Sequence, residues 1–341
     1  MSTMFEKIQG HTRLLNPFKD FALEEIPFEI RFDPLTGQTG RVFDIPFKAE
    51  PPNLEDTVRR SREIFCPFCP EALEKSTPLF PQDLIPEGRI SLGRATLIPN
   101  LVPFEKYAGV AILSDRHYLP MEELTPANMR DAFLACLQFF HAVAASDGGV
   151  RFLTVNWNYM PPAGSSIVHA HLQPNCGEVP TNELRAQMEG CRAYAGRRGS
   201  GFWEDFMEAE KRSGERYLAE IGPTFWALSF VPLGFLPDFW CVFREPGSLL
   251  DMEEEAADAF LEGLFAALKH FAEQNVFSFN VSVFSVRDDP EFRINARVSP
   301  RLLPRPIGNS DFAYLQALHR EPFCVRRPEA DLEKAQELFR S

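Results

Sequence analysis

The chain lacks two features, long apolar runs and an excess of basic residues. No stretch reaches the length of about 18 apolar residues that suggests a membrane-spanning helix, and the first 20 residues lack the apolar block of a signal peptide. We therefore expect a cytoplasmic protein without a membrane partner. With 35 Lys and Arg against 48 Asp and Glu, the formal charge is −13, which argues against a nucleic-acid partner. A small anionic substrate would need a local group of Arg, Lys or backbone N–H donors.

Cysteine is also scarce, and its pattern argues against a disulfide framework. The seven cysteines form an odd, dispersed set. Cys66-Pro-Phe-Cys69 has the spacing of half a zinc site, although a redox pair or two unrelated thiols would look the same. A zinc site needs two further ligands, and the chain has seven histidines. The other cysteines are expected to be reduced, packed thiols: Cys136, Cys176, Cys191, Cys241 and Cys324.

Hydrophobic patterning predicts two similar series of elements. The first series has strands at 108–113, 150–157 and 167–173, with a helix that begins at Thr125-Pro126 and ends at Gly148. The second series has strands at 225–233, 239–243, 276–286 and 292–298, with a helix at about 252–273. Residues 1–60 are expected to be mostly irregular, with a turn at 33–37 between two short extended pieces. The fold class is therefore predicted as α+β, with antiparallel half-barrel-like sheets backed by helices.

The closing strands of the two series can be laid on each other, which indicates an internal duplication. The run from Val168 to Pro174 matches the run from Ile294 to Pro300, but Asn295 and Arg297 stand where the first copy has His169 and His171. One copy therefore carries reactive side chains and the other lacks them.

The histidine-containing strand has a loop before it that suits a bound phosphate. Alternate side chains of a strand share a face, so His169, His171 and Gln173 are expected to point the same way. Gly164, Ser165 and Ser166 precede them in a turn that can present backbone N–H groups. The alternative interpretation is a half-buried strand whose polar side chains have hydrogen-bond partners within the protein and bind no ligand.

The combined motifs resemble the galactose-1-phosphate uridylyltransferase family of the histidine-triad superfamily. The run from Asn158 to Gln173, with Gly164, Ser166 and the His169-Ala-His171 pair, is similar to its active-site signature. Three further segments resemble that family: Cys66-Pro-Phe-Cys69, Arg31-Phe-Asp-Pro-Leu-Thr-Gly37 and Ile98-Pro-Asn100-Leu-Val-Pro103. The resemblance implies duplicated halves, with a catalytic half and its zinc site at 1–175, a helical connection at 176–222 and a degenerate half at 223–341.

The resemblance also implies a role for individual residues. Zn²⁺ would be held by four ligands: Cys66, Cys69, His117 and His169. His171 would be the nucleophile, with Gln173 and Ser166 on the phosphate oxygens. The expected substrate contacts are these: Asn158 at His171 or the phosphate, Asn100 near the nucleoside, Arg31 near an anionic phosphate, and the Gly164-Ser165 turn.

The implied activity is nucleotidyl transfer between sugar 1-phosphates by a ping-pong mechanism through a nucleotidyl-histidine. A nucleotide sugar and a sugar phosphate would be the substrates, in galactose or other carbohydrate metabolism, and related enzymes are homodimers. Two alternatives remain: an ADP-sugar or dinucleoside polyphosphate phosphorylase with the same nucleophile, and a catalytically idle, zinc-stabilised nucleotide-binding protein.

The sequence departs from the family pattern in several places. Ala170 replaces the proline between the histidines, and Tyr314-Leu-Gln316 and Glu321-Pro322-Phe323 replace the segments that read the hexose. Asn295 and Arg297 replace two histidines that bind a second metal in some members, so no second metal is expected. Arg297 or Arg301 could bind an anionic substrate group or form a surface ion pair.

Overall fold

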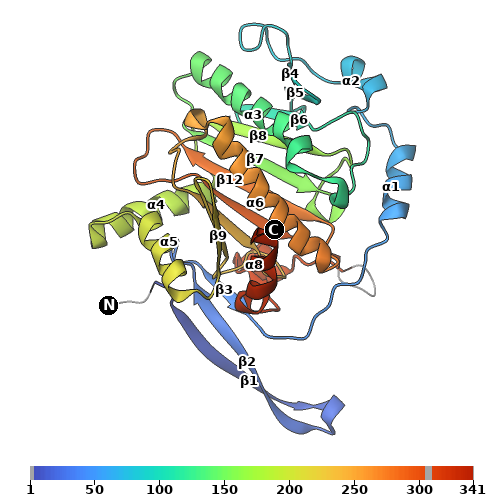
Figure 1. Cartoon of the computed structure of the whole chain (residues 1–341). Coiled ribbons are helices and arrows are strands. Elements are labelled where there is room, and N and C mark those ends of the chain that lie inside the picture. Colours follow the sequence, from blue (N-terminus) through green and yellow to red (C-terminus); the bar gives the residue numbers. More distant parts are fainter. Residues whose placement is uncertain (1–3, 304–308, 341) are drawn as a thin grey trace.

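The computed structural model describes residues 4–303 and 309–340, and its central feature is one ten-stranded sheet (Figure 1). In spatial order its strands are β4 (Ile90–Leu92), β5 (Ala95–Pro99), β6 (Tyr107–Ile112), β8 (His171–Gly177), β7 (Phe152–Tyr159), β12 (Phe279–Val286), β13 (Asn295–Pro300), β11 (Phe239–Phe243), β10 (Thr224–Leu228) and β9 (Tyr217–Ile221). All of its pairings are antiparallel. The predicted α+β class is confirmed, and β7 and β12 join the two series of strands into a single sheet.

The strand order repeats outward from the β7–β12 pair. The series β7, β8, β6, β5, β4 on one side matches β12, β13, β11, β10, β9 on the other. In this order β13 of the second half corresponds to β8 of the first. Arg297 therefore lies on the strand that corresponds to the strand of His171, which agrees with the sequence alignment of the two runs.

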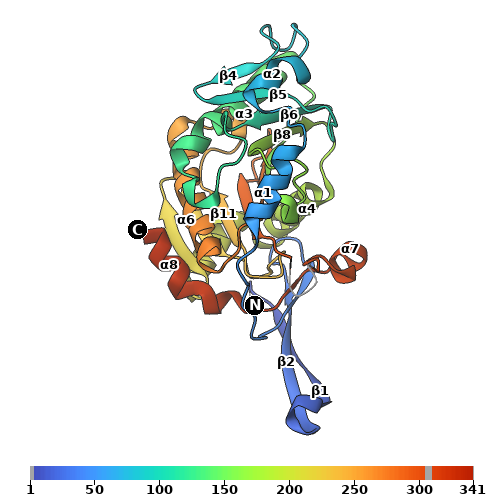
Figure 2. The same cartoon turned by 90° about the vertical axis from the view of Figure 1, so that its right-hand side faces the viewer.

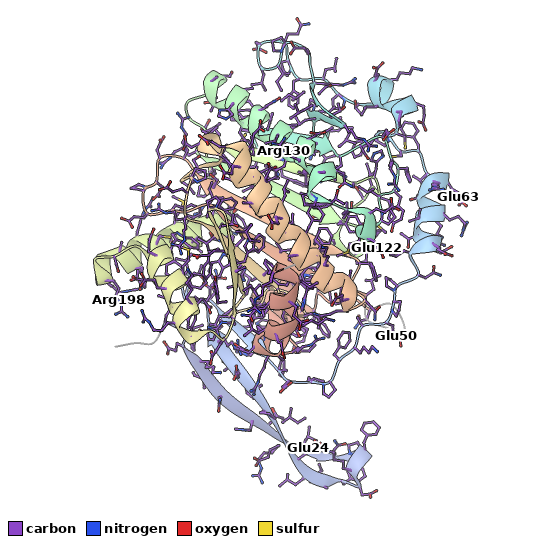
Figure 3. All side chains as sticks on the ribbon, viewed as in Figure 1. Glu24, Glu50, Glu63, Glu122, Arg130 and Arg198 are labelled. Carbon is purple, nitrogen blue, oxygen red and sulfur yellow. The ribbon has the colours of Figure 1, made fainter. Side chains whose placement is uncertain are left out.

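Two long helices cover one face of the sheet, one from each half. They are α3 (Pro126–Ser146), which begins with a capping box at Thr125, and α6 (Glu254–Glu273). Arg130 on α3 forms ion pairs with Glu254 and Asp258 on α6 and lies beside that helix in Figure 3. Apolar side chains of both helices and of the sheet form one buried core. The other face of the sheet carries polar side chains near its centre, and helices of a second apolar cluster cover it in the second half.

Residues 1–60 are more regular than the sequence predicted. β1 (Lys7–Asn16) and β2 (Ala22–Phe32) form a long antiparallel hairpin that projects from the body (Figures 1 and 2). The predicted turn at 33–37 joins β2 to β3 (Thr39–Val42), and β14 (Phe323–Cys324) pairs in parallel with β3. β1 is mostly polar and exposed, and β2 contains three glutamates and a proline. Cross-strand pairing outweighs the low β propensity of these residues.

The remaining helices lie around the sheet. They are α1 (Leu54–Glu63), α2 (Pro70–Ser76), α4 (Asn182–Arg198), α5 (Phe202–Ser213), α7 (Tyr314–His319) and α8 (Leu332–Arg340). The helices α4 and α5 pack a second apolar cluster under the opposite face of the second half. No helix in the described part of the chain is long and apolar enough to cross a membrane.

Candidate active site

The face of the sheet that α3 and α6 leave uncovered carries a row of polar side chains. The register aligns Gln173 with Asn156, Asn156 with Ser282, and Ser282 with Arg297 across four strands. Ser282 donates a hydrogen bond to Asn156 (2.9 Å), and the Asn156 amide donates to the backbone carbonyl of Gln173 (3.1 Å). The row thus connects the two halves by hydrogen bonds.

Four predicted metal ligands come together from three separate segments. The thiols of Cys66 and Cys69 and one ring nitrogen each of His117 and His169 all lie within 4.8 Å of one another. The Cys69 thiol lies 3.3 Å from His117 Nδ1, and the Cys66 thiol lies 3.7 Å from His169 Nδ1. Two thiols and two imidazoles are a donor set that suits tetrahedral Zn²⁺.

Hydrogen bonds behind the two imidazoles orient their Nδ1 atoms toward the thiols. His169 Nε2 lies 2.7 Å from the carbonyl of Ser114, which can only accept, so the proton is on Nε2. His117 Nε2 lies 2.9 Å from the hydroxyl of Ser61, whose proton is donated to the Val58 carbonyl. Both Nδ1 atoms therefore carry a free lone pair, the state that a metal ligand needs. Burial lowers the pKa of both rings, which favours this neutral form.

Both ring nitrogens of His171 have a partner. Its Nδ1 donates to the backbone carbonyl of His169 (2.7 Å), and its Nε2 accepts from the side-chain amide of Gln173 (3.3 Å). The ring is buried against Phe68, with ring centroids 5.2 Å apart, and burial lowers the pKa of His171. A neutral ring with a proton on Nδ1 has its lone pair on Nε2, and that nitrogen can act as a nucleophile.

The strand prediction around the histidines is partly wrong. β8 begins at His171, four residues later than predicted, and His169 lies before it. The two rings therefore do not simply share a strand face: His169 faces the thiols, while His171 begins the polar face beside Gln173. The difference arises because the backbone carbonyl of His169 accepts a hydrogen bond from the His171 ring.

The loop between β7 and β8 has strained and permissive backbone positions. Gly164 has φ +84°, which glycine adopts without cost. Met160 has φ +69° and ψ +161° and is buried, a conformation that costs a residue with a side chain about 1–3 kcal/mol. Its carbonyl accepts hydrogen bonds from the backbone of Ala163 and Ser165. The Ser165 side chain donates to the Ile167 carbonyl, and Ser166 is exposed next to it.

Asn158 is anchored from the second half of the molecule. Its side-chain oxygen accepts from the Asn280 amide (2.7 Å), which also donates to the carbonyl of Ala163 (2.9 Å). Asn158 lies two residues after Asn156, and His171 lies two residues before Gln173, so continuing the Asn156–Gln173 register brings Asn158 level with His171. Asn280 was not among the predicted site residues, because nothing in the sequence near it resembles a motif.

Two predicted substrate contacts, Asn100 and Arg31, are placed differently. Asn100 follows β5, and its side chain accepts from the backbone of Val102 (3.0 Å). Its own N–H donates to the carbonyl of Ala108, the partner of Asn175 on β8, so its place near a nucleoside stays a prediction. Arg31 is fully buried, and its guanidinium is used by Glu29, by both carboxylate oxygens of Glu329 and by the Phe230 carbonyl. The structure thus gives Arg31 an ion-pair network in place of the phosphate contact expected for it.

A cavity of about 210 Å³ lies on the polar face beyond Gln173. Thr154, Asn156 and Asn175 line its floor, and Phe104 and Phe152 are among its apolar walls. The cavity combines aromatic surface with amide groups, which suits a nucleoside. These residues were missed by sequence reasoning, because they are scattered over the chain.

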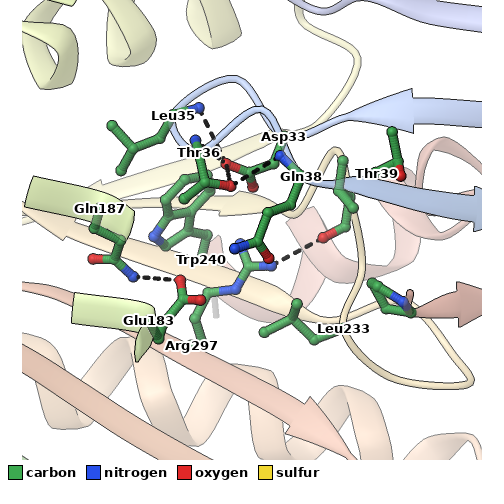
Figure 4. A pocket seen from close by; sticks show the side chains of 12 residues that line it. Asp33, Leu35, Thr36, Gln38, Thr39, Glu183, Gln187, Leu233, Trp240 and Arg297 are labelled. Atoms are coloured by element: carbon green, nitrogen blue, oxygen red, sulfur yellow. Dashed lines mark hydrogen bonds between the residues drawn. The ribbon is translucent and has the colours of Figure 1, made fainter. Parts of the chain in front are cut away.

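The equivalent position in the second half has different chemistry, shown in Figure 4. Arg297 stacks on Trp240 at 4.6 Å and donates to the Val231 carbonyl (2.9 Å). Asn295, which replaces His169, accepts from the Trp240 indole and donates to Gln187. The polar groups here are thus bonded to each other.

Comparisons with known proteins bear on the family. No family model matches the chain. An uncharacterized protein of Archaeoglobus fulgidus is 30% identical over 319 residues, covering 93% of this chain and 94% of that protein.

Solved structures show the same fold. A galT-like protein from Arabidopsis thaliana matches with a TM-score of 0.69 and 17% identity, over 91% of this chain and 98% of that one. An ADP-glucose phosphorylase from Arabidopsis thaliana with bound ADP-glucose matches with a TM-score of 0.68 and 16% identity, over 91% of this chain and 99% of that one. A uridylyltransferase matches with a TM-score of 0.63 and 15% identity, over 91% of this chain and 98% of that one. The chain therefore belongs to one family with the Archaeoglobus fulgidus protein, and its fold is that of the galactose-1-phosphate uridylyltransferases that its motifs resemble.

Proposed function

We propose that the protein is a nucleotidyltransferase that carries a nucleoside monophosphate on His171 Nε2. The observation that supports this most is the hydrogen bond from His171 Nδ1 to the His169 carbonyl, which directs the lone pair of Nε2 to the polar face beside Gln173. The structural neighbours named as a uridylyltransferase and an ADP-glucose phosphorylase agree with a reaction of this class.

We propose Zn²⁺ as the resident metal of the cluster formed by Cys66, Cys69, His117 and His169. The donor set fits, because both imidazoles present unprotonated Nδ1 atoms and both thiols face them. The metal would supply a structural clamp and take no part in the bond changes. Its effect would be to fix His169, whose carbonyl in turn fixes the ring of His171.

The reaction would proceed in two displacements. His171 Nε2 attacks the α-phosphorus of a nucleotide sugar; a nitrogen–phosphorus bond forms, and the bond to the oxygen of the leaving sugar 1-phosphate breaks. A phosphate oxygen of a second sugar phosphate then attacks the same phosphorus and releases the histidine. The Gln173 amide would donate to an oxygen of the transferred phosphate, with Ser166 and the Gly164-Ser165 backbone beside it. Because a phosphate leaves readily, an amide at Gln173 suffices where a hydrolase would benefit from an acid.

Intact-mass measurement after incubation with UDP-glucose or ADP-glucose tests the proposal. A mass gain of one nucleoside monophosphate is expected in the native protein, and no gain is expected in His171→Ala. The matched control is His141→Ala on α3, which lies outside the site and should retain the gain. Absence of a gain with every nucleotide sugar would favour the idle nucleotide-binding protein instead.

An ADP-sugar or dinucleoside polyphosphate phosphorylase is the second candidate. The match to an ADP-glucose phosphorylase with bound ADP-glucose supports it. Inorganic phosphate would then replace the second sugar phosphate as the acceptor. Discharge of the isolated adduct by phosphate, with release of a nucleoside diphosphate, would identify this activity; discharge only by sugar phosphates would identify the transferase.

We also propose that the protein is a cytoplasmic homodimer. The tip of the β1–β2 hairpin exposes Phe18 (96%) and Phe21 (66%), and α7 exposes Leu318. A projecting two-stranded hairpin is only marginally stable alone in water, so a partner surface is expected to cover it. Light scattering should show a dimer that Phe18→Ser with Phe21→Ser converts to monomer, while Lys19→Ser at the same tip does not.

A further inference from the structure

A second cavity, of about 380 Å³, lies where the two halves meet the loop of the active site. We call it the junction pocket. Its walls are the loop residues Met160, Pro161 and Pro162, together with Leu54 of α1, Leu302, and Arg301 beyond the end of β13. Its volume is in the range of small-molecule sites, and its lining is largely apolar with a few polar groups. The residues proposed to act on the transferred phosphate do not line this pocket.

Arg301 is presented to the pocket in a fixed orientation. Asp311 accepts from its Nε (3.0 Å) and Nη2 (2.8 Å), and the Asn280 side-chain oxygen accepts from its Nη1 (3.0 Å). A guanidinium has five N–H groups, so one N–H on each terminal nitrogen has no partner among the described residues. Two adjacent N–H donors of a guanidinium are suited to a bidentate contact with a phosphate or carboxylate.

The contacts of Arg301 continue through Asn280 to the loop between β7 and β8. Asn280, which accepts from Arg301, donates to Asn158 and to the carbonyl of Ala163. Asn280 and the position of His171 are two strands apart, so their backbones lie roughly 10 Å apart at a spacing of about 4.8 Å per strand. Arg301 follows β13, the next strand outward, and its guanidinium reaches back to Asn280, so the contacts Arg301–Asn280–Asn158 lead from the junction pocket toward the position of His171.

We propose that the junction pocket binds the acceptor of the nucleotidyl group, with its phosphate on Arg301 and its body between the loop and Leu302. This inference rests on the proposed function and assigns its second substrate a place. The second half, which lacks the histidine pair, would supply the anion-binding group, and Asn280 would connect acceptor binding to the loop that positions Asn158. A sugar phosphate and inorganic phosphate share the chemistry that Arg301 recognises.

The test is the discharge of isolated nucleotidyl-enzyme at increasing acceptor concentration. Arg301→Lys keeps the charge toward Asp311 but loses the bidentate fork, and we expect the half-saturating concentration to rise on the order of tenfold or more. Arg326→Lys is the matched control, because Arg326 also bonds an aspartate, Asp331, and an amide oxygen, that of Gln274. Equal half-saturation in Arg301→Lys and native protein would overturn the proposal.

Two further variants distinguish the acceptor and the coupling. Thr57→Phe fills the pocket from α1. If the sugar of the acceptor occupies the pocket, this variant should weaken discharge by glucose 1-phosphate and leave discharge by inorganic phosphate unchanged. Unchanged discharge by both acceptors would refute the site. Asn280→Ala should lower the discharge rate at saturating acceptor more than it changes half-saturation, and Asn280→Gln should restore part of it. An unaltered maximal rate in Asn280→Ala would exclude the coupling.

Failure of the proposed function would look different. If the native protein forms no adduct, calorimetric binding of glucose 1-phosphate and of inorganic phosphate still tests the pocket directly. Binding that is weakened by Arg301→Lys but not by Arg326→Lys would support the pocket alone, and binding that is equal in all three proteins would refute it.

Discussion

The two halves of the sheet share their strand order but differ at the pair of positions that matters most. In the first half His169 and His171 lie between the thiol cluster and the polar face; in the second half Asn295 and Arg297 bond to Trp240, Gln187 and the Val231 carbonyl. The comparison shows that the same topology positions two side chains in each half, and that residue identity decides which groups these side chains contact. In the proposed function, the first half carries the reacting group and the second half supports it.

The largest expected effect comes from removing the proposed nucleophile of the first half. His171→Ala should reduce nucleotidyl-adduct formation by on the order of a thousandfold or more, because the substitution removes the ring nitrogen proposed to attack the phosphorus. The measurement is adduct formation over time by intact mass. Retention of the full rate would contradict the assignment and with it the functional difference between the halves.

The next effect is on the proposed metal cluster, whose four candidate ligands all lie in the first half of the chain. Cys69→Ser, or removal of metal with a strong chelator, should lower the melting temperature by on the order of 10 °C, because a structural zinc site adds folding free energy. Metal analysis should show one zinc per chain in the native protein and its loss in the variant. Cys191→Ser, at a buried thiol outside the cluster, is the control and should keep its zinc.

A smaller loss of stability is expected in the second half. Arg297→Met leaves the buried Asp238 carboxylate, 3.9 Å from the guanidinium, without its cation and should cost about 3 kcal/mol in the free energy of unfolding. Urea unfolding gives the value. Adduct formation on His171 should be retained, and a loss of adduct in a folded variant would show that the halves are less separate than proposed.

The smallest effect is a dependence of stability on pH. Burial would raise the pKa of Glu329, but the hydrogen bond and charge of Arg31, with the charge of Arg216, hold it at about 2, below its ordinary 4.5. The ionised form is therefore favoured in the folded state, so its contribution is present above about pH 4.5 and is lost as the pH falls toward 2. The difference in melting temperature between native protein and Glu329→Gln should be constant above about pH 4.5 and shrink steadily as the pH falls toward 2. A constant difference would contradict this network.

The long elements were predictable because their signals are local. The helix α3 was predicted from Thr125-Pro126 and apolar spacing, and the structure begins it at Pro126. The β1–β2 hairpin was missed, although Ile26, Phe28, Ile30 and Phe32 of β2 do alternate with other residues. Its partner β1 is largely exposed and depends on pairing with β2, which no local pattern signals. The division of the chain at 175 and 222 stays a prediction.

Short-range spacing alone shows which groups are available for chemistry: a CxxC pair, an alternating histidine pair and a Gly-Ser-Ser turn. Which of these groups meet depends on the fold. The folded chain brings His117 to the thiols, pairs Arg31 with Glu329, and places Asn280 against the loop between β7 and β8, with Arg301 bonded to Asn280. These contacts depend on strand register and on loop closure between residues far apart in the chain, which a local side-chain pattern does not encode.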